Sequence, residues 1–123
     1  MPKKKIMIVD DDESLIEALT AVLEREGYEI IPAISGEECL EKLNTIKPDI
    51  ILLDMMMPGL SGRRVCKRIR ENPKTKNLKV AFLTVVKFSE TGKGTLKDLN
   101  VVDYITKPFD NEDLVKRVKK LVG

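Results

Sequence analysis

The sequence predicts an α/β fold in which an open, five-stranded parallel sheet is covered by helices on both faces, a doubly wound (βα)5 arrangement of three layers. Two observations predict it. Aliphatic runs of four to six residues alternate along the chain with longer segments whose apolar residues recur at helical spacing. These runs are apolar on both faces, as in a parallel sheet between two helix layers. The length of 123 residues fits one domain, which we expect to cover residues 1–123.

Five segments are predicted to be strands because each is an aliphatic run bounded by polar or turn-forming residues. They are Lys5–Val9, Glu29–Ala33, Asp49–Leu53, Val80–Thr84 and Val101–Ile105. Each is expected to be apolar on both faces, as a central parallel strand should be.

Four of the five predicted helices have a recognisable start. They begin after Asp12, Ser35, Ser61 and Asp110, and the first three end at Gly27, near Asn44 and before Pro73. Ser35 and Glu38 form a predicted capping box. The third and fifth helices are predicted to turn Val65, Cys66, Ile69, Leu114, Val118 and Leu121 inward. The fourth helix falls between Phe88 and Leu99 and is expected to be short or frayed, because Gly92 and Gly94 each cost about 1 kcal/mol relative to alanine in a helix interior.

Composition excludes several classes of function. The 22 basic and 20 acidic residues leave a net charge of +2, which requires neither nucleic acid nor a membrane as partner. The chain has no histidine, which removes the commonest general base, the commonest metal ligand and any catalytic pair built on histidine. Cys39 and Cys66 lack metal or redox spacing and are expected to be reduced packing residues.

No signal for secretion or membrane insertion is found. Three lysines at positions 3–5 resemble the start of a signal peptide, but only Ile6–Val9 follow before three aspartates. No apolar run approaches the roughly 18 residues typical of a transmembrane helix. We therefore expect a cytoplasmic protein with no membrane insertion.

Polar residues follow the predicted strands at the points where each strand ends. The first is followed by Asp10, Asp11 and Asp12, the third by Asp54, and the fifth by Lys107; the fourth ends in Thr84. The carboxyl ends of parallel strands meet at one edge of the sheet, where ligands bind in this class of fold. We expect these side chains to converge there.

The chemistry of this set points to phosphoryl transfer. The carboxylates of Asp10, Asp11 and Asp54 would repel one another unless a hard divalent cation lies between them, which predicts a Mg²⁺ site. Asp12 is expected to cap a helix instead. Lys107, which precedes a proline able to adopt a cis bond, could neutralise a bound anion. Asp54 would then be the nucleophile that forms an aspartyl phosphate.

Four motifs in this order resemble the response regulator receiver domain, the CheY-like phosphoacceptor module of two-component signalling with a flavodoxin-like fold. They are Ile-Val-Asp-Asp at residues 8–11, Leu-Leu-Asp-Met-Met-Met-Pro-Gly at 52–59, Phe-Leu-Thr at 82–84 and Tyr-Ile-Thr-Lys-Pro-Phe at 104–109. The resemblance covers almost the whole chain.

The resemblance implies a role for each site residue. Asp54 would accept phosphate from a histidine kinase or a phosphotransfer protein, and Lys107 would contact the phosphoryl group. Asp11, Asp54 and the backbone carbonyl of Met56 would ligate Mg²⁺, with Asp10 supporting the metal through water. Catalysis would be limited to Mg²⁺-dependent self-phosphorylation and self-dephosphorylation, so the domain is not expected to be an enzyme.

The resemblance also implies a switch. Thr84 would turn inward to bond a phosphoryl oxygen, Tyr104 would follow, and the surface of the fourth helix, fifth strand and fifth helix would change its affinity for an unknown downstream protein. The domain would be a monomer, or would form a weak dimer through that surface. Val85 departs from the small residue usual in the family and could crowd the phosphoryl pocket. Together with the altered fourth helix, Val85 leaves open the hypothesis of a degenerate receiver that acts only as a binding module.

Three other functions are less consistent with the sequence. A haloacid-dehalogenase-like phosphatase would use Asp10 as nucleophile and Asp12 as acid, but does not explain Asp54. An FMN-binding flavodoxin would meet three aspartates that repel its phosphate. The third predicted helix is basic through Arg63, Arg64, Lys67, Arg68 and Arg70, but a solvated helix face explains these residues better than direct contact with nucleic acid.

Overall fold

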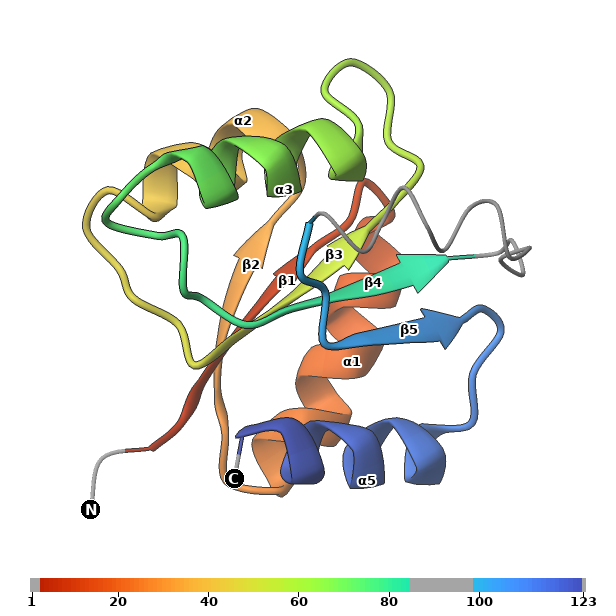
Figure 1. The fold of residues 1–123 in the computed structure, drawn as a ribbon. Coiled ribbons are helices and arrows are strands. Elements are labelled where there is room, and N and C mark those ends of the chain that lie inside the picture. Colours follow the sequence, from red (N-terminus) through yellow and green to blue (C-terminus); the bar gives the residue numbers. More distant parts are fainter. Residues whose placement is uncertain (1–2, 85–98, 123) are drawn as a thin grey trace.

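A five-stranded, all-parallel sheet forms the middle layer of the protein (Figure 1). The computed structural model describes residues 3–84 and 99–122. The strands follow the order β2-β1-β3-β4-β5 across the sheet. Their bounds are β1 (Lys5–Val9), β2 (Glu29–Ala33), β3 (Ile50–Asp54), β4 (Val80–Thr84) and β5 (Asp103–Thr106). The order reverses direction after β1, and this confirms the predicted doubly wound fold.

Helices cover both faces of the sheet. They are α1 (Glu13–Arg25), α2 (Gly36–Lys42), α3 (Gly62–Glu71) and α5 (Asn111–Val122). Figure 1 shows α1 and α5 on one face and α2 and α3 on the other. The fourth predicted helix, between Phe88 and Leu99, and Val85 both fall in the segment 85–98 and lie outside the described residues. None of the helices within 3–84 and 99–122 has the length and apolar character needed to cross a bilayer.

The helix starts follow the predicted capping residues. Asp12 accepts a hydrogen bond from the Leu15 N–H at 3.2 Å, and the helix stops before Gly27, whose φ is 92°. Ser35 Oγ accepts from the Glu38 N–H at 3.1 Å, as expected for a capping box. The reciprocal bond differs, because the Glu38 carboxylate accepts from the N–H of Ile34 and not of Ser35. The N-terminus of α2 is therefore tied to the chain one residue further back.

The third and fifth predicted strands were misplaced at both ends, since they end at Asp54 and Thr106, one residue later than predicted. The third strand begins at Ile50, because the Asp49 carboxylate accepts the Lys5 N–H at 2.7 Å and so precedes the ladder. The fifth begins at Asp103, after Asn100 has taken a φ of 53°. The expectation that every strand is apolar on both faces was wrong for β2 and β5, which form the two edges of the sheet and expose residues such as Pro32 and Thr106.

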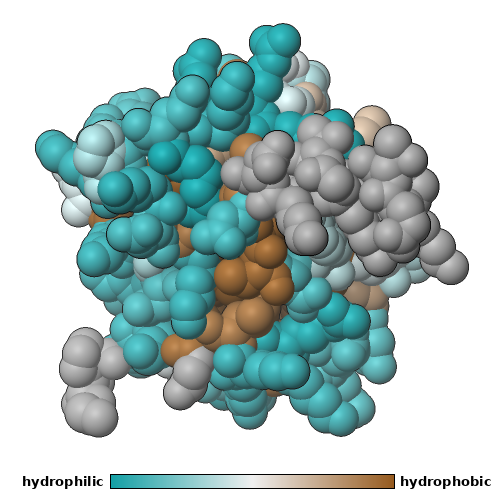
Figure 2. Space-filling view, in the orientation of Figure 1, coloured by the Kyte–Doolittle hydropathy of each residue, from teal (hydrophilic) through white to brown (hydrophobic). Residues whose placement is uncertain are grey.

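Two apolar cores enclose the sheet. One, between the sheet and α2–α3, contains Cys39 and the predicted inward residues Val65, Cys66 and Ile69, all fully buried. The other lies under α1 and α5 and contains Leu114 and Val118, while Leu121 is only partly buried. Both cysteines are free, and burial raises the pKa of the Cys39 thiol to about 12, which fits a packing role. Outside these cores the surface in Figure 2 is mostly hydrophilic, with apolar surface gathered near its middle.

Arg70 is not part of a solvated helix face, which corrects the prediction for this residue. Its guanidinium donates to the carbonyls of Leu99 at 2.7 Å and Asn100 at 3.1 Å, in the segment that leads into β5. It also donates to Leu78 at 2.7 Å and Lys76 at 2.9 Å, in the loop that leads into β4. One planar side chain thus holds together the entries to two neighbouring strands.

Replacing Arg70 by alanine is expected to lower the free energy of unfolding by about 2–3 kcal/mol, because four carbonyls lose a charged donor. Arg68→Ala, which removes an exposed arginine of the same helix, should change it by less than about 0.5 kcal/mol. Urea denaturation of both variants measures the difference. Equal effects of the two substitutions would contradict the role given to Arg70.

Candidate functional site

The predicted site residues converge at the carboxyl edge of the sheet. Asp10 directly follows β1, Asp54 ends β3, Thr84 ends β4 and Lys107 directly follows β5. Asp10, Asp54 and Thr84 are almost fully buried, with 1%, 5% and 1% of their surfaces exposed. Asp11 is exposed beside them. The prediction that these side chains meet is confirmed for Asp10, Asp11, Asp54 and Lys107, and Thr84 lies at the same edge of the sheet.

Three carboxylates form a cluster that could hold a metal ion. One oxygen from each of Asp10, Asp11 and Asp54 lies within 4.8 Å of the others. Hard cations such as Mg²⁺ prefer oxygen ligands and use a small number of carboxylates together with water. The donor chemistry, the close approach and the partial exposure of the cluster all fit such an ion.

Lys107 supplies the positive charge of the cluster. Its Nζ lies 2.6 Å from Asp10 Oδ2 and 3.7 Å from Asp54 Oδ1, so one ammonium faces two carboxylates. The backbone holds this position, because the Lys107 N–H donates to the Thr84 carbonyl at 2.6 Å. The Lys107–Pro108 peptide bond is cis, as the sequence suggested.

Asp54 has an unusual protonation equilibrium. Its pKa is raised from 3.8 to about 6, chiefly because burial disfavours the charged carboxylate. The N–H of Met56, which donates to Asp54 Oδ1 at 3.2 Å, opposes this, as does the Lys107 ammonium. The Asp10 and Asp11 charges raise the pKa further. Negative charge at Asp54 is therefore incompletely compensated by the chain's own groups.

Gly62, which the sequence analysis did not single out, allows the loop after β3 to close over the site. Its N–H donates to the Met55 carbonyl at 3.2 Å, and a Cβ at this position would lie 2.2 Å from the Asp54 carbonyl oxygen. Any side chain would push the loop away from Asp54. The available signal was a glycine directly after the helix-capping Ser61, where glycine is a poor helix former.

The two predicted switch residues lie on neighbouring strands. Tyr104 of β5 is paired with Phe82 of β4, and their rings stack with centroids 6.2 Å apart. Thr84 lies two residues beyond Phe82 on the same strand, so its side chain is on the same face of the sheet. Tyr104 is half-buried, and burial raises the pKa of its hydroxyl. Thr84 and Tyr104 therefore lie on the same face of the sheet, separated by Phe82.

The two aspartates that a phosphatase mechanism requires, Asp10 and Asp12, take part in other interactions. Asp10, its expected nucleophile, accepts the Asp12 N–H at 2.9 Å on one oxygen and pairs with Lys107 on the other. Asp12, its expected acid, caps α1 as predicted. Both aspartates are accounted for without acid–base chemistry.

The fold and site together define a flavodoxin-like domain with an acidic, lysine-containing cluster at the carboxyl edge of its sheet, as in phosphoacceptor domains. Comparison with known proteins agrees: residues 6–119 match the response regulator receiver domain. The chain belongs to this family of two-component signalling domains.

Curated relatives are longer than this chain. The alkaline phosphatase synthesis transcriptional regulatory protein PhoP of Bacillus subtilis (strain 168) is 42% identical over 119 residues, which are 97% of this chain and 48% of PhoP. The phosphate regulon transcriptional regulatory protein PhoB of Rhizobium meliloti (strain 1021) is 37% identical over 119 residues, 96% of this chain and 52% of PhoB. The chain therefore spans about half the length of these relatives.

Solved receiver structures match the whole fold. The chemotaxis protein CheY4 of Vibrio cholerae superposes with a TM-score of 0.90 at 28% identity, covering 98% of this chain and 99% of CheY4. A CheY-like receiver domain protein of Methanospirillum hungatei JF-1 gives 0.87 at 37% identity, covering 99% and 96%. These likenesses agree with the sheet order and helix layers described above.

The raised pKa of Asp54 predicts that Asp54→Asn stabilises the metal-free protein. At about pH 7.5 the folded state holds an ionised, poorly compensated carboxylate, so the variant should gain about 1–2 kcal/mol in the free energy of unfolding. The gain should shrink as the pH falls through about 6, where Asp54 binds a proton in the folded state, and vanish below 3.8, where it is protonated in both states. Urea denaturation in EDTA measures it.

A matched control for this substitution is Glu41→Gln, which removes an exposed carboxylate outside the site. Its effect should stay within about 0.5 kcal/mol. Saturating Mg²⁺ should stabilise the wild type more than Asp54→Asn and so narrow the difference between their free energies of unfolding. A variant less stable than the wild type in EDTA would show that the ionised Asp54 carboxylate does not destabilise the folded state.

Proposed function

We propose that Asp54 accepts a phosphoryl group and that the three-aspartate cluster holds Mg²⁺ for this reaction. The observation that carries the proposal is the Lys107 ammonium, 3.7 Å from an Asp54 oxygen in a cluster of three carboxylates. A nucleophilic carboxylate, a divalent-cation site and a fixed positive charge are the groups that phosphoryl transfer to aspartate requires.

Asp10, Asp11 and Asp54 would hold the Mg²⁺ ion, together with the backbone carbonyl of Met56. The ion supplies positive charge that offsets the charge on the transferring phosphoryl oxygens. The Met56 side chain is 65% exposed, so its residue lies at the mouth of the site. Membership of the receiver family and the acidic cluster support this assignment.

The transfer step uses the ionised form of Asp54. A carboxylate oxygen attacks phosphorus, a P–O bond forms, and the bond from phosphorus to the donor's leaving atom breaks. With a phosphohistidine donor, the leaving imidazole nitrogen takes up a proton. Lys107 would pair with a phosphoryl oxygen, exchanging part of its contact with Asp10 for one with the new anion.

The added charge would then be transmitted through Thr84 and Tyr104. We infer that the Thr84 hydroxyl bonds a phosphoryl oxygen and that Tyr104 moves further toward the core. The stacking of Tyr104 on Phe82, two residues before Thr84, supports this coupling. The surface of β5 and α5, with the predicted fourth helix, would present the result to a downstream protein.

Partners follow from the family. A histidine kinase or a phosphotransfer protein would supply the phosphoryl group, in the cytoplasm, and the domain would act as a monomer or weak dimer. PhoP and PhoB are named transcriptional regulatory proteins, and we propose that this domain regulates an output of such a kind without itself contacting nucleic acid. Apart from self-phosphorylation and self-dephosphorylation, we propose no catalytic turnover.

Incubation with acetyl phosphate and Mg²⁺ should add one phosphoryl group to the chain, visible in the intact mass. Asp54→Asn should abolish the adduct, because the nucleophilic oxygen is lost. Lys107→Gln should reduce its yield, and omission of Mg²⁺ should prevent it.

The same experiment separates the remaining readings. Asp12→Asn serves as the control, since Asp12 caps α1 and should leave the adduct in place. An adduct that survives Asp54→Asn but not Asp10→Asn would favour the phosphatase reading. A wild type that binds Mg²⁺ without forming any adduct would identify a degenerate receiver and overturn the proposal.

A further inference from the structure

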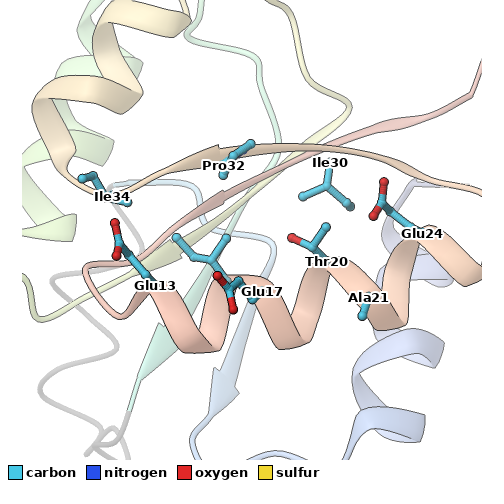
Figure 3. A pocket seen from close by; sticks show the side chains of 9 residues that line it. Glu13, Glu17, Thr20, Ala21, Glu24, Ile30, Pro32 and Ile34 are labelled. Atoms are coloured by element: carbon cyan, nitrogen blue, oxygen red, sulfur yellow. The ribbon is translucent and has the colours of Figure 1, made fainter.

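A groove runs between α1 and β2, and none of Asp10, Asp11 and Asp54 lines it. It encloses about 660 Å³ and has an apolar floor formed by Ile16, Ile30, Pro32 and Ile34 (Figure 3). Ile34 is 45% exposed, and in the groove it lies beside the apolar side chains of Ile16 and Ile30. The groove therefore offers apolar area that the chain itself leaves in contact with water.

Acidic residues line the helical side of the groove. Glu13, Glu17 and Glu24 lie along one stripe of α1, and Figure 3 shows them opposite the β2 side chains. Within residues 3–84 and 99–122, no lysine or arginine forms an ion pair with any of the three. No basic residue lines the groove either. Its charge is complementary to a cation that the described chain does not provide.

A metal ion does not explain these carboxylates. In the described part of the chain, only Asp10, Asp11 and Asp54 bring three potential ligands close enough to share an ion. The groove glutamates are spread over three turns of α1, a distance of about 16 Å at 1.5 Å per residue. A partner that neutralises all three glutamates must therefore carry its positive charges over a similar length of α1.

An added β-strand does not fit the groove. Pro32, in the middle of β2, has no N–H to donate to a neighbouring strand. The Lys42 ammonium donates to the Pro32 carbonyl, which occupies the acceptor at the same position. The outer edge of β2 is thus blocked against strand pairing at its centre, and an occupant must bind through side chains.

We propose that this groove binds a cationic amphipathic helix of a partner protein. The apolar stripe of such a helix would cover Ile30 and Ile34, and its lysine or arginine residues would face Glu13, Glu17 and Glu24. A helix fits because its side chains repeat along three turns, as the glutamates do. This site is separate from the phosphoacceptor chemistry, since neither Asp54 nor Lys107 lines the groove.

A second copy of this chain is a poorer occupant. The basic residues of α3, such as Arg63, Arg64 and Lys67, are exposed and could face the glutamates. However, the apolar residues of α3, Val65 and Ile69, are fully buried in its own core. An α3 helix can therefore offer charge but no apolar stripe to the groove.

The test uses a labelled synthetic peptide of about 16 residues, long enough to match the groove as a helix. Leucines occupy one face of an alanine-rich helix at i, i+3, i+4 and i+7, and lysines flank that face. A matched peptide carries glutamate in place of every lysine. Fluorescence anisotropy gives the dissociation constants, and amide NMR shifts locate the binding site.

The lysine peptide should bind and the glutamate peptide should not. Glu17→Lys should weaken binding by about tenfold or more, because it places a like charge opposite the peptide. Ile34→Gln should weaken it through loss of apolar contact. Raising the salt from about 0.05 M to about 0.5 M should weaken the wild-type complex by screening the charges.

Glu41→Lys is the matched control, since it makes the same charge change at an exposed residue of α2 outside the groove. It should leave the affinity within about twofold. Equal losses in Glu17→Lys and Glu41→Lys, or NMR shifts centred away from residues 13–34, would overturn the proposal. Self-association of the chain that Glu17→Lys abolishes would assign the groove to a second copy and also overturn it.

Discussion

The ion pair between Lys107 and Asp10 is the interaction on which the geometry of the site depends. It joins the segments that follow β5 and β1, two strands separated by β3 and β4, through a contact of 2.6 Å. The same ammonium faces Asp54 at the end of β3. One positive charge therefore organises three strand ends, but it cannot neutralise three carboxylates. The remaining negative charge favours a cation, and in the proposed function that cation would offset the charge of a phosphoryl group.

The backbone around Asp54 also contributes to the geometry and the charge of the site. The strand carries the carboxylate into a largely buried position, where its charge is costly, and the Met56 N–H only partly offsets that cost. Gly62 lets the following loop return to within contact of the Asp54 carbonyl. Burial thus raises the energy of the ionised Asp54 carboxylate, and a cation held by the cluster would lower it.

The sequence predicted the positions of the site residues better than the contacts that hold the neighbouring loops and strands in place. Asp10, Asp54 and Lys107 could be placed together because parallel strands end at one edge, a constraint that holds without knowledge of side-chain packing. The bonds of Arg70 could not be predicted, since they depend on how two loops far apart in the chain approach α3. The start of β3 was misplaced by one residue because the Asp49 carboxylate competes for a backbone N–H. The edge position of β2 was missed because Ile30, Ile31 and Ala33 read as a buried run.

The central claim is that Lys107 and a divalent cation compensate the same carboxylates. Calorimetric titration with Mg²⁺ of the wild type, Lys107→Gln and Asp54→Asn tests it most directly. If the claim holds, Lys107→Gln binds Mg²⁺ more tightly than the wild type, because a competing positive charge has been removed, while Asp54→Asn binds it more weakly. An unchanged or weakened affinity in Lys107→Gln would contradict the account.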